Sequence, residues 1–109
     1  MGATTSAQLQ AEIKAFVDER EWSQFHSPRN LAAAISVEAA ELLDIFRWSD
    51  GTSYDDSMTP AVADEVADVL ICCISLCNQL QLDVAETVRA KVAKNEAKYP
   101  VERYKGKWR

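Results

Sequence analysis

The stretch of sequence that decides the fold is TPAVADEVADVLICCISLCNQL, residues 59–80. Its opening, Thr59-Pro60, combines an N-cap with the proline that suits a first helical turn, which predicts a helix start. From Val69 onward this helix is apolar on most of its surface, so it has to be covered on several sides. A chain of this length buries a low fraction of its surface and has difficulty covering such a helix alone. We therefore expect an all-α homo-oligomer in which helices of two chains pack together.

Three more helices are expected around this one, and no alternating strand pattern of any length interrupts them. The last helix ends at Tyr99-Pro100, because proline cannot continue a helix. Capping residues mark the starts, namely Thr5 with Gln8, Ser27 before a proline, and Asp83 with Glu86. The expected helices cover residues 6–22, 28–48, 60–80 and 84–99, with a loop at 49–59. Together they predict a four-helix bundle-like single domain over residues 1–109, with its core at 6–100 and a basic tail at 101–109.

The net charge of the chain is −5 and is unevenly distributed, because residues 1–88 carry a balance of −11 and residues 89–109 a balance of +6. An acidic chain lacks the basic footprint of a general nucleic-acid binder. The longest apolar run, Val69 to Leu76, is too short to span a bilayer, and no secretory leader is recognised. The three cysteines match no zinc or disulfide spacing. We expect a soluble cytoplasmic protein without a nucleic-acid or membrane partner.

Two pairs of carboxylates fall where apolar residues are expected. On the helix at 28–48, Glu38 lies about 20° from Leu31, in the middle of the apolar stripe, and Glu41 follows one turn later at its edge. On the next helix, Glu65 lies about 60° from the apolar line, and Asp68 follows one turn later. Two neighbouring helices therefore each direct a pair of acids toward the expected core.

Buried carboxylates that repel one another need cations. Arg29 and Arg47 are the nearest in sequence and are too few for four charges. Oxygen ligands favour hard ions such as Mg²⁺ or Mn²⁺, and the sole histidine, His26, lies on no Glu-x-x-His motif of a di-iron bundle. The pattern thus predicts a magnesium site. The alternative is a plain helical oligomerisation domain whose carboxylates are solvated.

Four acids around one divalent ion leave an excess of negative charge, which favours further metal ions and an anionic ligand such as a polyphosphate. The chain has no glycine-rich phosphate loop, so basic side chains would have to bind the phosphates. Lys91, Lys94 and Lys98 recur at helical spacing, with Asn95 alongside. Lysines near a helix C-terminus are also favoured by the helix dipole alone, and this second explanation stays open.

The ordered set of motifs resembles a known family. Glu38-Ala-Ala-Glu41 followed by Glu65-Val-Ala-Asp68 is similar to the ExxE…ExxD signature of the MazG-like all-α nucleoside triphosphate pyrophosphohydrolases. The resemblance covers roughly residues 8 to 100 and is nearest to the dCTP pyrophosphatase branch. Four further stretches carry the same resemblance, namely WSQFHSPRNL at 22–31, FRW at 46–48, DVLI at 68–71, and the run from Lys91 to Pro100.

The resemblance implies a Mg²⁺-dependent enzyme, with Mn²⁺ as a substitute, that splits a nucleoside triphosphate into the monophosphate and pyrophosphate. It implies dCTP or a modified pyrimidine deoxynucleotide as the substrate, and a role in nucleotide-pool housecleaning. Glu38, Glu41, Glu65 and Asp68 would hold the metal, and Glu38 or Glu41 would also orient or deprotonate the attacking water. The implied substrate contacts are Trp22, His26, Asn30, Trp48, Lys91, Asn95 and Tyr99.

Members of this family are dimers or tetramers with sites shared between chains. This agrees with the expectation that the apolar helix at residues 59–80 needs a second chain to cover its surface. Two positions depart from the vertebrate members, because Ile13 stands where they usually have histidine and Cys72 where they usually have tyrosine. The resemblance therefore does not assign the preferred base. An alternative function is a non-catalytic, nucleotide-binding regulatory oligomer.

Overall fold

The computed structural model describes residues 2–47 and 54–107, and all regular structure in these ranges is helical. Two short 3₁₀ helices, Trp22–Phe25 and Asp56–Met58, precede the second and third α-helices. No helix in the described ranges is both long and apolar enough to cross a membrane. The α-helices are α1 (Ser6–Glu19), α2 (Pro28–Asp44), α3 (Thr59–Gln79), α4 (Val84–Lys98) and α5 (Val101–Tyr104).

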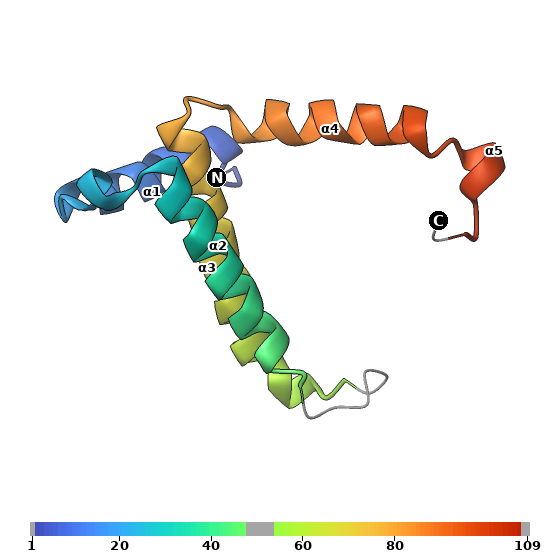
Figure 1. Cartoon of the computed structure of the whole chain (residues 1–109), viewed down its shortest axis with the longest axis horizontal. Helices are drawn as coiled ribbons and strands as arrows, with labels where there is room; N and C mark the ends of the chain where they lie inside the picture. Colours follow the sequence, from blue (N-terminus) through green and yellow to red (C-terminus); the bar gives the residue numbers. More distant parts are fainter. Residues whose placement is uncertain (1, 48–53, 108–109) are drawn as a thin grey trace.

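The centre of the structure is a hairpin of α2 and α3, which lie side by side along their length and make the most extensive contact in the chain (Figure 1). α1 packs across the end of α3, and α4 leaves that end with α1 as its main neighbour. The all-α prediction is confirmed. The expected four-helix bundle does not close within one chain, because the turn after α3, with Gln81 at a left-handed φ of 57°, directs α4 away from the hairpin.

The capping predictions are confirmed at three helix starts. The Thr5 hydroxyl accepts a hydrogen bond from the Gln8 amide at 3.1 Å, and the Gln8 side chain accepts one from the Thr5 amide at 2.7 Å. Ser27 accepts from the amide of Asn30 at 3.1 Å. Asp83 caps α4 by accepting from the amide of Glu86 at 2.8 Å. These bonds satisfy amides that have no partner in the first helical turn.

Three predicted boundaries and one predicted cap are wrong. α2 ends at Asp44 rather than Trp48, where the chain turns and the amide of Arg47 donates to the Asp44 carbonyl at 3.3 Å. Met58 rather than Thr59 is the N-cap of α3, and no described side chain caps this helix.

α1 ends at Glu19 rather than Trp22, because Glu21 adopts a left-handed φ of 54° and the chain continues as the 3₁₀ turn Trp22–Phe25. The tail predicted to follow Pro100 instead forms the short helix α5, in which the amide of Tyr104 donates to the Pro100 carbonyl at 3.0 Å.

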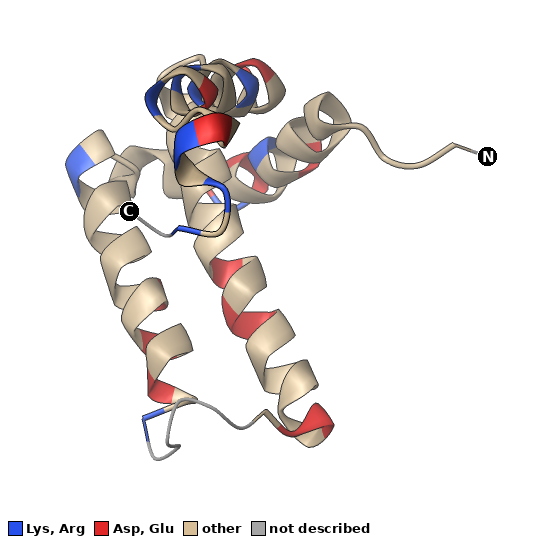
Figure 2. Ribbon diagram, turned by 90° about the vertical axis from the view of Figure 1, so that its right-hand side faces the viewer, with Lys and Arg blue, Asp and Glu red and all other residues tan. Residues whose placement is uncertain are grey.

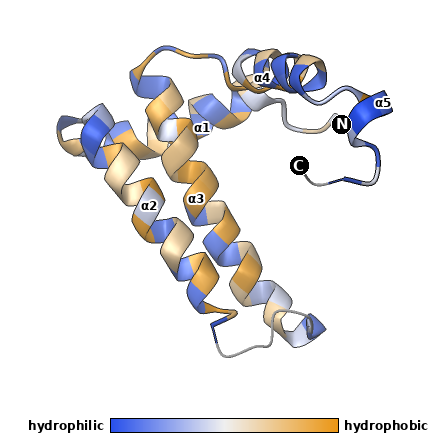
Figure 3. Ribbon diagram, turned by 45° about the vertical axis from the view of Figure 1, so that its right-hand side comes forward, coloured by the Kyte–Doolittle hydropathy of each residue, from blue (hydrophilic) through white to orange (hydrophobic). Residues whose placement is uncertain are grey.

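The single chain leaves much apolar surface uncovered. Its radius of gyration is 17.0 Å, against about 13 Å for a compact domain of this length. Its accessible surface is 8832 Å², against about 6,100 Å² for a compact monomer of its mass. The buried apolar residues of the described ranges are Val17, Leu31 and Ile74. Figure 3 shows that α3 is hydrophobic over much of its length, and Leu70 on this helix is 53% exposed.

The amide side chain of Gln10 joins α1 to the turn between α3 and α4. Its Nε2 donates to Asn78 Oδ1 and to the Leu82 carbonyl, each at 3.0 Å, and its Oε1 accepts from the Val84 amide at 2.9 Å. Asn78 Nδ2 donates in return to the Gln10 carbonyl at 3.1 Å. One side chain thus satisfies polar groups from two other elements and fixes the place of α1 on the hairpin.

We expect Gln10→Ala to lower the free energy of unfolding by about 1–3 kcal/mol, because it leaves part-buried polar groups without partners. Denaturant unfolding at constant protein concentration measures the change. Gln24→Ala is the matched control, since Gln24 makes one local bond to the Glu21 carbonyl. Equal effects of the two substitutions would show that the Gln10 bonds do not hold α1 in place.

Candidate metal and nucleotide site

The antiparallel course of α2 and α3 brings their carboxylates together. One carboxylate oxygen from each of Glu38, Glu65 and Asp68 lies within 4.8 Å of the other two. The fourth acid, Glu41, adjoins them, since it lies close enough to raise the pKa of both Glu38 and Glu65. Figure 2 shows the acidic positions following both long helices. The structure therefore joins the two sequence-predicted pairs into one group, the acidic cluster.

The acidic cluster is electrostatically unsatisfied. Oε2 of Glu38 and Oε2 of Glu65 are both buried and accept no hydrogen bond from any described residue. The pKa of Glu38 is raised above its ordinary value, first by its hydrogen bond with Glu41, then by burial, and then by the charges of the other three acids. Burial is the main reason that the pKa of Glu65 is raised, followed by the charge of Glu41. No ion pair within the described ranges includes a member of the cluster.

These features fit a hard divalent cation. Two ligands on opposite sides of an ion with bonds of about 2.1 Å are about 4 Å apart, close to the spacing of the cluster oxygens. All donors are carboxylate oxygens, which Mg²⁺ and Mn²⁺ prefer and which softer metals do not. A cation at this position would give the buried oxygens of Glu38 and Glu65 the partner that they lack. The donor set fits the predicted metal.

A pocket of about 330 Å³ lies beside the cluster, between the 3₁₀ turn after α1, the start of α2 and the middle of α3. Cys72 lines it, and the pKa of the Cys72 thiol is raised by burial and by the charges of Glu38 and Asp68, so the pocket and the cluster adjoin. Asn30 is oriented by donating from Nδ2 to the Phe25 carbonyl at 3.0 Å. The side chains that shape the pocket include Trp22, Phe25, His26, Asn30, Ile71 and Cys72.

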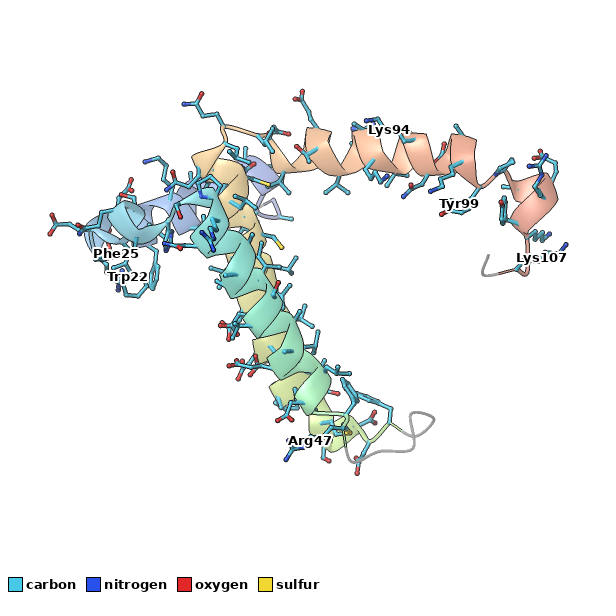
Figure 4. The ribbon with its side chains drawn as sticks, viewed as in Figure 1. Trp22, Phe25, Arg47, Lys94, Tyr99 and Lys107 are labelled. Carbon is cyan, nitrogen blue, oxygen red and sulfur yellow. The ribbon has the colours of Figure 1, made fainter. Side chains whose placement is uncertain are left out.

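The pocket contains three of the predicted base contacts, namely Trp22, His26 and Asn30. The fourth, Trp48, lies outside the described residues. Sequence reasoning missed Phe25 and Ile71 as pocket residues. A signal existed for each, because Phe25 belongs to the quoted stretch at 22–31 and Ile71 lies one helical turn after Asp68. Figure 4 shows Trp22 and Phe25 together at the end of α1.

The predicted phosphate contacts lie far from the acidic cluster and the pocket within one chain. Lys91, Asn95 and Tyr99 lie on α4 or at its end, and α4 points away from the α2–α3 hairpin. Figure 4 shows Lys94 and Tyr99 along α4, remote from Trp22 and Phe25. Tyr99 instead contacts Tyr104 edge to face, with ring centroids 5.1 Å apart. Within one chain the two sets of predicted substrate contacts therefore lie apart.

Comparison with known protein families gives a match of residues 33–108 to the MazG-like family. The chain belongs to the MazG-like family. Its similarity to a solved member, a pyrophosphatase of Archaeoglobus fulgidus, has a TM-score of 0.76 at 37% identity and covers 92% of this chain and 96% of that one.

Two curated MazG-like relatives carry the names of enzymes. Mouse (Mus musculus) dCTP pyrophosphatase 1 is 35% identical over 96 residues, which are 84% of this chain and 56% of that protein. The dATP/dGTP diphosphohydrolase of Cyanophage S-2L is 35% identical over 94 residues, which are 86% of this chain and 76% of that protein. The chain thus spans just over half of the length of the mouse relative.

We expect Glu38→Gln to raise the melting temperature of the metal-free protein by several degrees and to abolish its further rise with Mg²⁺. The substitution removes one of four repelling charges and supplies an amide that donates a hydrogen bond. Thermal unfolding with chelator and then with Mg²⁺ measures both effects.

Glu96→Gln is the control for this test, because Glu96 is an exposed acid on α4. It should leave both melting temperatures unchanged. A Glu38→Gln protein that is destabilised without metal, yet still stabilised by Mg²⁺, would contradict a cation site at the cluster.

Proposed function

We propose that this chain is a metal-dependent pyrophosphohydrolase of deoxynucleoside triphosphates, which it splits with water into the monophosphate and pyrophosphate. The observation that carries the proposal is the acidic cluster with its two unpartnered buried oxygens, lying beside an aromatic pocket of about 330 Å³. A nucleotide has these two needs, a cation site for its phosphates and stacking faces for its base. The names of the curated relatives support the same reaction class.

The four acids of the cluster hold Mg²⁺, with Mn²⁺ as a substitute. The bound ion supplies positive charge to the polyphosphate and lowers the pKa of a coordinated water. Glu38 or Glu41 accepts the proton of the water that attacks the α-phosphorus. Support for this role comes from the place of Glu38 in the acidic cluster that would hold the ion and its water.

The pocket receives the base. Trp22 offers a ring face for stacking, and His26 and Asn30 offer polar atoms at its wall. We propose dCTP or a modified pyrimidine deoxynucleotide as the preferred substrate and housecleaning of the nucleotide pool as the role. The named relatives of the chain include a dCTP pyrophosphatase and a dATP/dGTP diphosphohydrolase.

The active unit is a homo-oligomer in which α4 of one copy reaches the cluster of another. This arrangement would bring Lys91, Asn95 and Tyr99 to the phosphates and sugar. Two observations support it: the accessible surface of 8832 Å² exceeds that of a compact monomer, and α4 leaves its own hairpin. Val88 on α4 is 56% exposed, so this helix also has apolar surface to bury against a partner.

We expect Mg²⁺-dependent conversion of a deoxynucleoside triphosphate to its monophosphate and pyrophosphate, and at least a roughly 100-fold loss of kcat in Glu41→Gln. Substitution of Glu38, Glu65 or Asp68 by the amide should have the same effect. Phosphate release in the presence of added inorganic pyrophosphatase measures turnover, and circular dichroism checks that the helices are retained. Substantial Mg²⁺-dependent hydrolysis by a folded Glu41→Gln protein would count against the proposal.

A regulatory nucleotide binder is the competing function, and the same proteins distinguish it. Such a protein would gain thermal stability from Mg²⁺ and nucleotide together while hydrolysing none of the common or damaged triphosphates. A plain oligomerisation domain would show neither effect. All four cluster positions carry acids, so nothing in the sequence supports a loss of catalysis.

The shared site predicts complementation between two inactive variants. Glu41→Gln and Lys91→Ala chains, co-expressed with different tags and purified as mixed dimers, should recover about half of wild-type activity, because one of the two symmetric sites contains neither change. Each variant alone should be inactive or nearly so. Mixed dimers that remain as inactive as their parents would place both residues in the same chain's site, contrary to the proposal.

A further inference from the structure

Ser75 on α3 is a buried polar residue that the proposed reaction does not use. It is 5% exposed and stands between Ile74 and Leu76 on this helix. The buried side-chain oxygens that lack a partner in the described part of the chain are those of Glu38 and Glu65, so the Ser75 hydroxyl is not among them. Ser75 does line the wall of a pocket, where a hydroxyl is available to a ligand as donor and acceptor.

The position of Ser75 connects it to the nucleotide pocket. Ser75 lines the pocket of about 330 Å³ and also a second pocket of about 180 Å³. Ser75, His26 and Val17 are common to both linings, so the two pockets are adjacent compartments. The second compartment has polar walls that include Lys14, Asp18, Asn78 and Gln79.

The order of residues along α3 matches the order of groups in a nucleotide. Asp68, Cys72 and Ser75 follow one another at steps of four and three residues, so they lie along one face of the helix. With a rise of 1.5 Å per residue, Ser75 lies about 10 Å along the axis from Asp68. A nucleotide whose phosphates lie at the acidic cluster then places its sugar near Cys72 and the far edge of its base near Ser75.

We propose that Ser75 is a specificity residue whose hydroxyl hydrogen-bonds an exocyclic group on the edge of the base that faces away from the sugar. This inference rests on the proposed function, because it assigns the base of the same substrate to the pocket. A hydroxyl both donates and accepts, so Ser75 satisfies an amino or an oxo group and disfavours a base that has neither. The second compartment leaves room behind that edge for a substituent on the base.

The test compares each base with an analogue that has hydrogen in place of the exocyclic group. kcat/KM is measured for dCTP against its pyrimidin-2-one analogue, and for dATP against the deoxynucleotide of unsubstituted purine. The wild-type protein should prefer the natural member of whichever pair it hydrolyses by about tenfold or more. Ser75→Ala should lower kcat/KM for that natural nucleotide about tenfold and leave the analogue unchanged, so that the preference disappears.

Two further variants separate hydrogen bonding from packing. Ser75→Cys nearly preserves the side-chain volume but replaces the hydroxyl with a weak donor, and it should behave as Ser75→Ala does. Ser36→Ala is the matched control, because the Ser36 hydroxyl donates to the Ala32 carbonyl of its own helix at 3.2 Å. It should leave the preference intact.

The outcomes distinguish this inference from the proposed function. A wild-type protein that hydrolyses none of the common or damaged deoxynucleoside triphosphates with Mg²⁺ refutes the pyrophosphohydrolase proposal itself. A wild-type protein that is active on such a nucleotide but shows no preference within either pair overturns this inference alone. An active wild-type protein whose Ser75→Ala variant loses equal activity toward both members of a pair assigns Ser75 a structural role and overturns the inference. An unchanged preference in an active Ser75→Ala variant overturns it as well.

Discussion

Mutual repulsion among four carboxylates between α2 and α3 is the constraint on which the rest of the structure depends. Apolar contact holds the two helices together, while Glu38 and Glu65 each keep a buried oxygen without a partner at their interface. Side chains selected only for stability would not occupy these positions. A cation would convert the repulsion into coordination, so the features that make the metal-free hairpin unfavourable would favour the binding of a divalent ion.

The fold could largely be predicted from the sequence, because its signals are local. The bonds at Thr5, Ser27 and Asp83 each involve residues three positions apart, so capping patterns reveal them. The direction of α4 could not be predicted in this way, because it depends on the backbone angle of Gln81, a residue type that carries no turn signal. The early end of α1 has the same cause at Glu21.

The candidate site likewise has a part that local sequence patterns predict and a part that they do not. The helical period places Glu38 and Glu65 toward the core, and antiparallel packing of consecutive helices then makes their meeting predictable. Pocket walls are harder to predict, because they join residues distant in sequence, as Phe25 and Ile71 show. The sequence gives no sign that Ser75 differs from other helical serines, because its burial is known only from the structure. The proposed pairing of α4 with a partner would involve contacts between chains, on which a single chain's periodicity gives no direct information.

The charge asymmetry of the chain links assembly to chemistry. Residues 1–88 have a balance of −11 and residues 89–109 a balance of +6, and the basic part begins within α4, which leaves the acidic hairpin. In one chain the two parts are therefore kept apart. Association of two copies would allow the basic helix of each to approach the acidic hairpin of the other, which relieves repulsion within both parts. The same contact would place lysines opposite the metal ligands, where a polyphosphate needs cations on both of its sides. The attraction between the basic helix of one copy and the acidic hairpin of the other would then favour both assembly and substrate binding.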